Sequence, residues 1–238
     1  MRILLIRHGD PDYENDTLTE KGCREAELLA KRALSLHMGK CYVSPLGRAK
    51  DTASCTLKKN GRTATECKWL REFDVKIRRP DLHGEKIIPW DWTKIENFYS
   101  FDRWWDNDIL REGKMKEEYD WVTQNFDKVL AEHGYVREGH YYRAEKANED
   151  TLVFFCHFGV SCVLISYLLS ISPLVMLQNF CAAPSSVSTI VTEERRKGIA
   201  SFRMSSFGDI SHLYAHQEPP AFAARFCETY DNKEQRHD

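Results

Sequence analysis

Two histidines and one arginine in this sequence have the chemistry of a nucleophile and an anion-binding pocket. Arg7 and His8 directly follow the aliphatic run Ile3–Ile6, and His157 directly follows a second apolar run, Leu152–Cys156. A neutral imidazole can attack an electrophile, and a guanidinium group binds dianions such as phosphate. The pattern indicates phosphoryl-transfer chemistry, although a histidine at a strand end can also be a hydrogen-bonded boundary residue.

The two apolar runs are the elements that must position these side chains. Short continuous apolar runs are typical of strands buried on both faces of a sheet. In open α/β sheets, ligands bind outside the carboxyl ends of the strands, and Gly9 lets the backbone turn there without a Cβ clash. If the two strands are parallel and adjacent, His8 and His157 lie side by side at one edge.

Arg48 is a further candidate, because it lies in the segment SPLGRAKDTA at residues 44–53. A short strand at 41–43 precedes this segment, and a helix carrying Arg48, Thr52 and Cys55 follows the turn. The N-terminus of a helix offers free N–H groups to an anion, and an arginine in the first turn adds a planar fork suited to phosphate oxygens. The alternative is an arginine paired with a surface carboxylate.

The segment at 44–53 matches the pattern S-P-L-x-R-A-x-x-T-A at every specified position. Together with Arg7-His8-Gly9 and the His157 block, in this order, it resembles the histidine phosphatase (phosphoglycerate mutase-like) superfamily over residues 1 to about 215. The resemblance implies a three-layer α/β/α sandwich around a mostly parallel mixed sheet. It also implies that His8 is the nucleophile, and that Arg7, Arg48 and His157 bind phosphate as part of the catalytic group.

Glu72 is the expected general acid, because Leu70-Arg71-Glu72 resembles the L-x-E segment of the superfamily. The usual glycine-rich continuation is missing, since residues 73–77 read FDVKI. Asp74, Glu85 and His83 therefore remain as possible substitutes. The second histidine block also departs from the superfamily, because Phe158 stands where glycine is common, and it could narrow the pocket or shift a backbone donor.

The 238 residues fit one large domain at 1–215, with an insertion at about 78–150 and a C-terminal tail at 216–238. Five of the six tryptophans lie between Trp90 and Trp121, within the insertion. These rings predict an aromatic lid over the active site that could grip an apolar leaving group. The alternative is that they form the small core of the insertion itself.

Hydrophobic periodicity and turn residues predict the remaining elements. A helix is expected from Thr17 or Thr19 to about His37, with the apolar stripe Ala26, Leu29, Ala30, Ala33 and Leu34. Strands are expected at 63–69, 187–192 and 199–204, the last two as a hairpin with its turn at 193–198. Further helices are expected along the stripe from Met115 to Leu130 and at 160–169, and a polar loop at 135–150.

Composition excludes several classes of protein. A net charge of −2 gives no basic field for nucleic acid, and no apolar run is long enough to cross a membrane, so a cytoplasmic protein is expected. The eight cysteines form no C-x-x-C pair and are expected to be reduced thiols. His212 and His216 have i, i+4 spacing but lack the glutamate of a zinc-binding H-E-x-x-H motif.

The leading hypothesis is a metal-independent phosphomonoesterase that acts on a small phosphorylated metabolite, without a cofactor and possibly as a homodimer. A cofactor-dependent phosphoglycerate mutase is the first alternative, but Glu14 stands where mutases usually have asparagine, and their proline-rich cap segment is absent. The second is an inactive phosphate-binding or scaffold protein. Cysteine phosphatase, serine hydrolase and P-loop chemistry are not supported, because C-x5-R, G-x-S-x-G and G-x-x-x-x-G-K-[ST] are missing.

Overall fold

A mixed sheet of eight strands runs through the molecule in the order β5-β4-β10-β1-β11-β12-β9-β8. This computed structural model describes residues 1–221 and 229–232. The strands are β1 (Arg2–Arg7), β4 (Cys41–Val43), β5 (Ala64–Glu66), β8 (Tyr135–Glu138), β9 (Tyr141–Ala144), β10 (Thr151–Cys156), β11 (Val187–Arg196) and β12 (Ile199–Asp209). Strands β5, β4, β10 and β1 run parallel to one another. Every pairing in the rest of the order, from β1 through β11, β12 and β9 to β8, is antiparallel. The sheet is therefore mixed as expected, but its parallel part is only one half.

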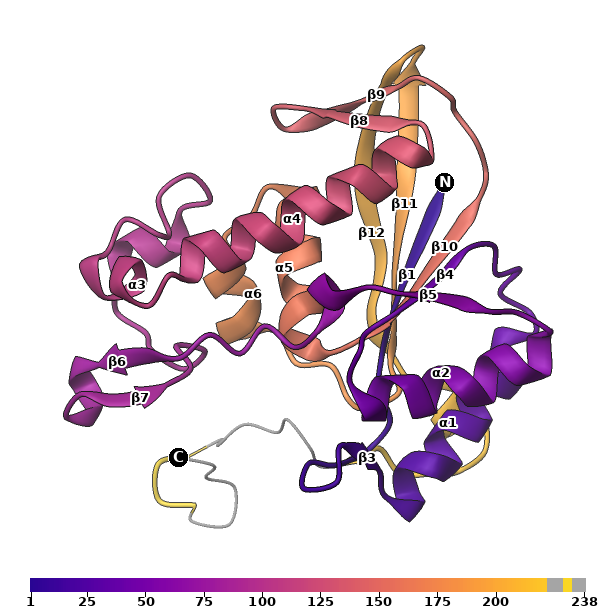
Figure 1. The fold of residues 1–238 in the computed structure, drawn as a ribbon, viewed down its shortest axis with the longest axis horizontal. Helices are drawn as coiled ribbons and strands as arrows, with labels where there is room; N and C mark the ends of the chain where they lie inside the picture. The colour runs from indigo at the N-terminus through magenta and orange to yellow at the C-terminus, as the bar shows by residue number, and fades with distance from the viewer. Residues whose placement is uncertain (222–228, 233–238) are drawn as a thin grey trace.

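Helices cover both faces of this sheet, which gives the expected three layers (Figure 1). They are α1 (Glu20–Ala33), α2 (Gly47–Asn60), α3 (Asp108–Glu112), α4 (Met115–Glu132), α5 (Phe158–Leu169), α6 (Pro173–Asn179) and α7 (Ser211–Tyr214). Successive residues of β1 point to opposite faces, as the pleat of a strand requires. Leu4 and Ile6 pack in a cluster with Leu29 of α1, whereas Ile3 and Leu5 belong to the cluster that contains α4 and α5. The central strand is thus buried on both sides.

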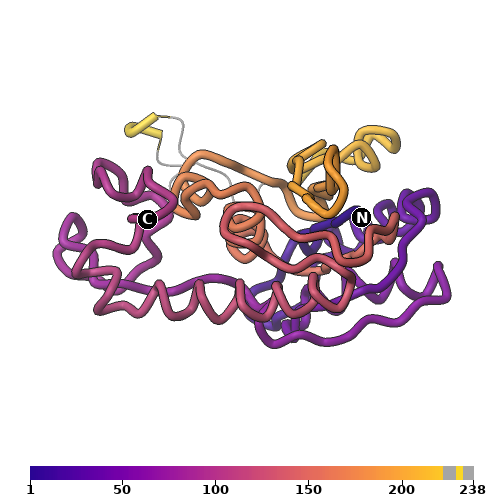
Figure 2. Tube along the Cα trace, turned by 90° about the horizontal axis from the view of Figure 1, so that it is seen from above, coloured from indigo at the N-terminus to yellow at the C-terminus, as the bar shows by residue number. Residues whose placement is uncertain are grey.

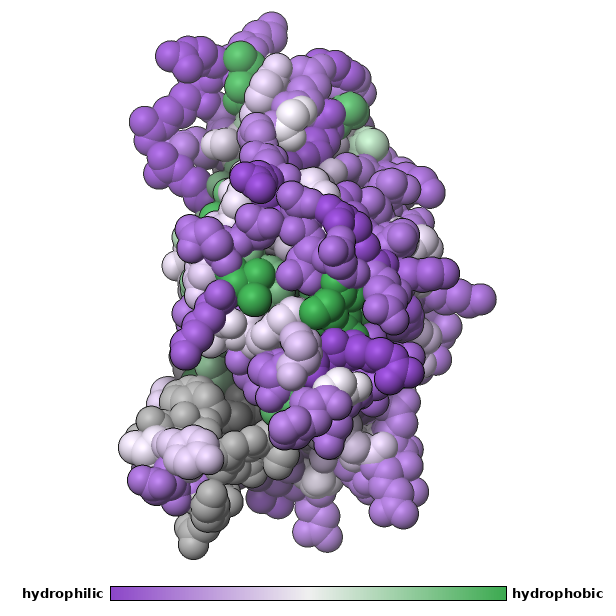
Figure 3. Space-filling view, turned by 90° about the vertical axis from the view of Figure 1, so that its left-hand side faces the viewer, coloured by the Kyte–Doolittle hydropathy of each residue, from purple (hydrophilic) through white to green (hydrophobic). Residues whose placement is uncertain are grey.

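The hairpin β6 (Ile77–Arg79) with β7 (Glu85–Ile87) and helix α3 lie at one end of the long axis, and α1 with α2 lies at the other (Figures 1 and 2). Helix α4 of the insertion runs from the first end toward β8 and β9 at the edge of the sheet. Several aromatic rings of the insertion pack on one another, for example Trp104 on Trp105 and on Tyr119. Seen from this end, the surface is mainly hydrophilic with small hydrophobic patches (Figure 3). The buried rings Trp92, Phe98 and Trp104 belong to the same cluster as Leu5 and Phe154 of the sheet, so among the described residues the insertion extends the main core and has no separate core of its own.

The structure corrects several predicted boundaries. Residues 135–144 are not a loop, because β8 and β9 form a hairpin that completes one edge of the sheet, whereas residues 145–150 form neither helix nor strand, as predicted. The helix from Thr19 ends at Ala33 rather than near His37, and Leu34 is 59 % exposed. The strand expected at 63–69 ends at Glu66 and is followed by a 3-10 turn, Lys68–Leu70. In the predicted hairpin, β11 extends to Arg196, so residues 193–196 are strand rather than turn.

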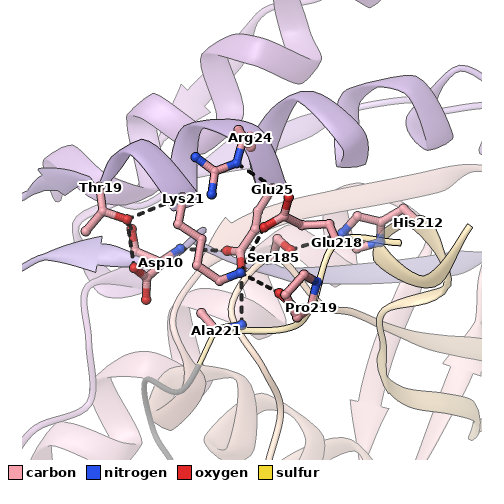
Figure 4. Close-up of polar contacts among 11 residues, drawn as sticks. Asp10, Thr19, Lys21, Arg24, Glu25, Ser185, His212, Glu218, Pro219 and Ala221 are labelled. Carbon is pink, nitrogen blue, oxygen red and sulfur yellow. Dashed lines mark hydrogen bonds and ion pairs between the residues drawn. The ribbon is translucent and has the colours of Figure 1, made fainter. Parts of the chain in front are cut away.

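The segment that follows α7 returns to α1 near the start of the chain (Figure 4). Glu218 forms ion pairs with Lys21 and Arg24, and the backbone N–H of Ala221 donates to Glu25. Part of the predicted tail, residues 222–228 and 233–238, lies outside the described residues, as does Cys227. Cys41, Cys67, Cys156 and Cys162 are buried thiols. Within the part of the chain that the structure describes, no helix is long and apolar enough to span a bilayer.

Candidate active site

The two histidines come from the ends of neighbouring parallel strands. Strand β1 pairs with β10 with Arg7 opposite Cys156, so His8 and His157 occupy equivalent positions just beyond the ladder. The backbone N–H of His8 continues the pattern by donating to Cys156 O at 3.1 Å. The ring centroids of the two histidines are 5.1 Å apart. The sheet therefore brings together two imidazoles that are about 150 residues apart in the sequence.

His8 is held as a neutral imidazole with a defined tautomer. Its side chain is only 2 % exposed, and its Nδ1 lies 2.7 Å from Gly9 O. We assign the proton to Nδ1, because a carbonyl oxygen can only accept, and the lone pair is then on Nε2. Burial, with Arg7 and Arg48 nearby, lowers the pKa of His8 to about 3. His8 is thus unprotonated on Nε2 at neutral pH, the form that a nucleophile requires.

Ser44 orients the second imidazole. Its Oγ lies 2.7 Å from His157 Nε2 and also accepts a hydrogen bond from the Leu46 N–H. We assign the hydroxyl as the donor to Nε2, because this uses its proton while its oxygen accepts from Leu46, and the proton of His157 is then on Nδ1. Burial, together with His8 and the two arginines, lowers the pKa of His157 well below its usual value. Nδ1 is buried and has no hydrogen-bond partner among the described residues, so it is a donor available to a ligand.

Arg7 and Arg48 bring positive charge to the same place. Arg7 donates through Nη1 to Ala182 O at 2.5 Å, and Arg48 donates through Nη1 to Asp16 Oδ1 at 2.5 Å. The Nε atom of each arginine is buried without a partner among the described residues. Both charges act on the pKa of His8 and of His157, which places them around the imidazole pair. The Asp16 carboxylate also accepts from Gly47 N at 2.7 Å, at the start of α2.

Thr52 links the two main motifs. Its Oγ1 accepts from the Gly9 N–H at 2.9 Å and donates to Arg48 O at 2.8 Å. Sequence reasoning did not assign roles to Ser44, Thr52 or Asp16. The sequence could have indicated Ser44 and Thr52 as site residues, because both stand at specified positions of the pattern that contains Arg48. Asp16 lies in no such pattern.

Glu72 lies next to this group, at the N-terminus of α5. Its Oε1 accepts from the backbone N–H groups of Phe73 at 2.9 Å and of Val160 at 3.1 Å. Burial raises the pKa of Glu72, while these hydrogen bonds and the Arg7 charge act in the opposite direction. A carboxyl group with a raised pKa can hold a proton and deliver it. Both hydrogen bonds reach Oε1, which leaves Oε2 as the oxygen suited to proton transfer.

The other candidate acids are placed differently. Asp74 is exposed and lies 3.7 Å from Arg71, and His83 and Glu85 are exposed on the β6–β7 hairpin. His212 is buried against Ser185, and the Nδ1 of His216 lies 3.0 Å from His212 O. Among the described residues, no three His, Cys, Asp or Glu side chains gather as a metal site requires.

A neutral imidazole, unpartnered cationic donors and a partly buried carboxyl group at one end of an α/β sheet are the groups that phosphoryl transfer requires. The family model described as "Histidine phosphatase superfamily (branch 1)" matches residues 3–204. The chain belongs to the histidine phosphatase superfamily, a family of phosphatases and related mutases. No curated protein sequence matches it significantly.

Solved structures share the fold at low sequence identity. A phosphoserine phosphatase from Entamoeba histolytica, in complex with 3-phosphoglyceric acid, is 17 % identical with a TM-score of 0.57, over 89 % of this chain and 98 % of that chain. A mycobacterial glucosyl-3-phosphoglycerate phosphatase is 17 % identical with a TM-score of 0.56, over 87 % and 98 %. The alpha-ribazole phosphatase from Shigella flexneri is 21 % identical with a TM-score of 0.54, over 86 % and 95 %.

Proposed function

We propose that this protein is a phosphomonoesterase that hydrolyses a small phosphorylated metabolite through a phosphohistidine on His8. One observation carries the proposal: three buried donors, Arg7 Nε, Arg48 Nε and His157 Nδ1, have no hydrogen-bond partner in the described part of the chain. Buried donors without partners are costly, and a phosphoryl group would satisfy all three. The similar solved structures include phosphatases of small phosphate esters, which supports this assignment.

The first step forms a bond between His8 Nε2 and phosphorus and breaks the bond between phosphorus and the ester oxygen. Glu72 gives its proton to the leaving oxygen and becomes a carboxylate. In the second step this carboxylate takes a proton from water, and the resulting hydroxide attacks phosphorus and breaks the bond to His8. The arginines remain cationic throughout, so their charges can hold the phosphate without a metal ion.

The test is turnover of p-nitrophenyl phosphate by the purified protein, with and without a chelator. We expect equal rates in the two conditions, a phosphorylated intermediate that is stable to base but not to acid, and loss of both activity and intermediate in His8→Ala. His140→Ala, which removes an exposed histidine between β8 and β9, serves as the matched control. Interconversion of 3- and 2-phosphoglycerate that requires the bisphosphate would favour the mutase instead. Phosphate binding without any turnover would favour the inactive protein.

A further inference from the structure

Trp90 stands apart from the other tryptophans of the insertion, because it lies against the Glu72 carboxylate. Gly159, in the first turn of α5, shows how close the two are. A Cβ atom added to Gly159 would lie 2.6 Å from Trp90 Cζ2 and 2.8 Å from Glu72 Oε1. The absence of a side chain at Gly159 therefore leaves room for an indole ring beside the proposed general acid.

Phe158 extends this aromatic surface toward the phosphate-binding arginine. Its ring packs edge-on against Trp90, with the centroids 5.6 Å apart. On the other side, Arg7 Cζ lies 5.9 Å from the centroid of the Phe158 ring. The two rings thus form a continuous apolar wall that runs from the Arg7 guanidinium to the edge of Glu72. We call Trp90 and Phe158 the aromatic wall.

The position of the wall determines which part of a substrate it meets. A general acid must be within hydrogen-bond reach of the oxygen that it protonates. The leaving alcohol therefore begins beside Glu72, where Trp90 lies. Trp90 is only partly buried, so part of its indole ring is accessible to a bound alcohol.

We propose that the aromatic wall is the leaving-group subsite, and that it selects phosphate esters whose alcohol carries a flat apolar group. This inference rests on the proposed function, since it assumes that Glu72 protonates the alcohol. A flat apolar group gains contact with the accessible part of the Trp90 ring, which packs against Phe158, itself only 6 % exposed, whereas a short aliphatic or polyhydroxylated alcohol gains little. Trp90 is therefore the residue that determines specificity.

The test compares kcat/KM for 2-phenylethyl phosphate and propyl phosphate. Both are esters of simple primary alcohols, so the bond that breaks is chemically matched and the aromatic ring is the variable. We expect the wild type to prefer the phenylethyl ester, Trp90→Ala to lower that preference by about three- to tenfold, and Trp90→Phe to retain most of it. Tyr99→Ala removes an aromatic ring that is 53 % exposed in the same insertion and serves as the control.

Inhibition by inorganic phosphate separates the wall from the phosphate site. We expect the inhibition constant to be unchanged in Trp90→Ala, because no phosphate-binding side chain is altered. Equal turnover of the two esters by the wild type, or an equal loss on both esters in Trp90→Ala, would overturn the inference while leaving the proposed function intact. Absence of phosphohistidine and of turnover with every ester would refute the proposed function itself.

Discussion

Glu25 allows a direct test of how burial shifts the pKa of a carboxyl group in this fold. Its side chain is fully buried on α1, where Oε2 accepts from Asp10 N at 2.8 Å and Oε1 accepts from Ala221 N at 3.2 Å (Figure 4). Lys21 Nζ lies 3.9 Å away, and Glu218 faces the same lysine. Burial raises the pKa of Glu25 from 4.5 to about 7, although both hydrogen bonds and Lys21 act against it.

The sign of the stability effect follows from this raised pKa. Between the unfolded pKa and the folded pKa, the folded protein binds more protons at Glu25 than the unfolded chain does. The contribution of protonated Glu25 to the stability of the folded state is fully present below about pH 4.5 and is lost as the pH rises through about 7. A shift from 4.5 to about 7 corresponds to about 3 kcal/mol of unfolding free energy.

Glu25→Gln removes the titration, so the comparison with the wild type isolates it. We expect the unfolding free energy of the variant minus that of the wild type to rise by about 3 kcal/mol across this range, most of it between pH 5 and 7. The assay is urea unfolding followed by tryptophan fluorescence at several pH values. Glu27→Gln, which changes an exposed glutamate on the same helix, is the matched control. A difference for Glu25→Gln that does not change with pH, or that falls as the pH rises, would refute the reasoning.

Three further predictions concern the site. Glu72→Gln should lower the rate of phosphohistidine formation from alkyl phosphates by about 10²–10⁴ and much less from p-nitrophenyl phosphate, whose leaving group needs no acid; equal losses in single-turnover assays of this first step would argue against Glu72 as the acid. Ser44→Ala leaves His157 Nε2 buried without its partner and should reduce the unfolding free energy by about 1–3 kcal/mol, measured in urea, whereas an unchanged midpoint would contradict a stabilising hydrogen bond between Ser44 and His157. Gly159→Ala should reduce stability by about 1–3 kcal/mol through overpacking and also reduce turnover; a fully active, stable variant would show that Glu72 tolerates displacement.

The parts of the fold that were predictable are those in which a long-range contact is encoded by a local pattern. The runs before His8 and His157 are continuous and apolar, and strands of this kind pair in the middle of a sheet. Their adjacency in β1 and β10 is confirmed by the pairing of Arg7 with Cys156. The segment around Arg48 likewise forms a helix at the expected turn.

The parts that were not predictable depend on partners that are distant in the sequence. Strands β8 and β9 are short and partly exposed at the edge of the sheet, so their composition resembles that of a loop. Glu25 is a charged residue whose burial is compensated by backbone N–H groups from Asp10 and Ala221, which no helical periodicity reveals. The contact of Trp90 with Gly159 also joins segments about 70 residues apart. The predicted roles of Glu72 and the other site residues stay predictions until they are tested by activity.

The two-sided burial of β1 ties the geometry of the site to the packing of the protein interior. A slip of one residue between β1 and β10 would exchange the side chains that face α1 with those that face α5, and both helix layers would lose their fit. His8 and His157 therefore cannot separate unless the packing of the whole core changes. Loops around the site are not part of this packing, so they can change to accommodate other substrates without moving His8 and His157.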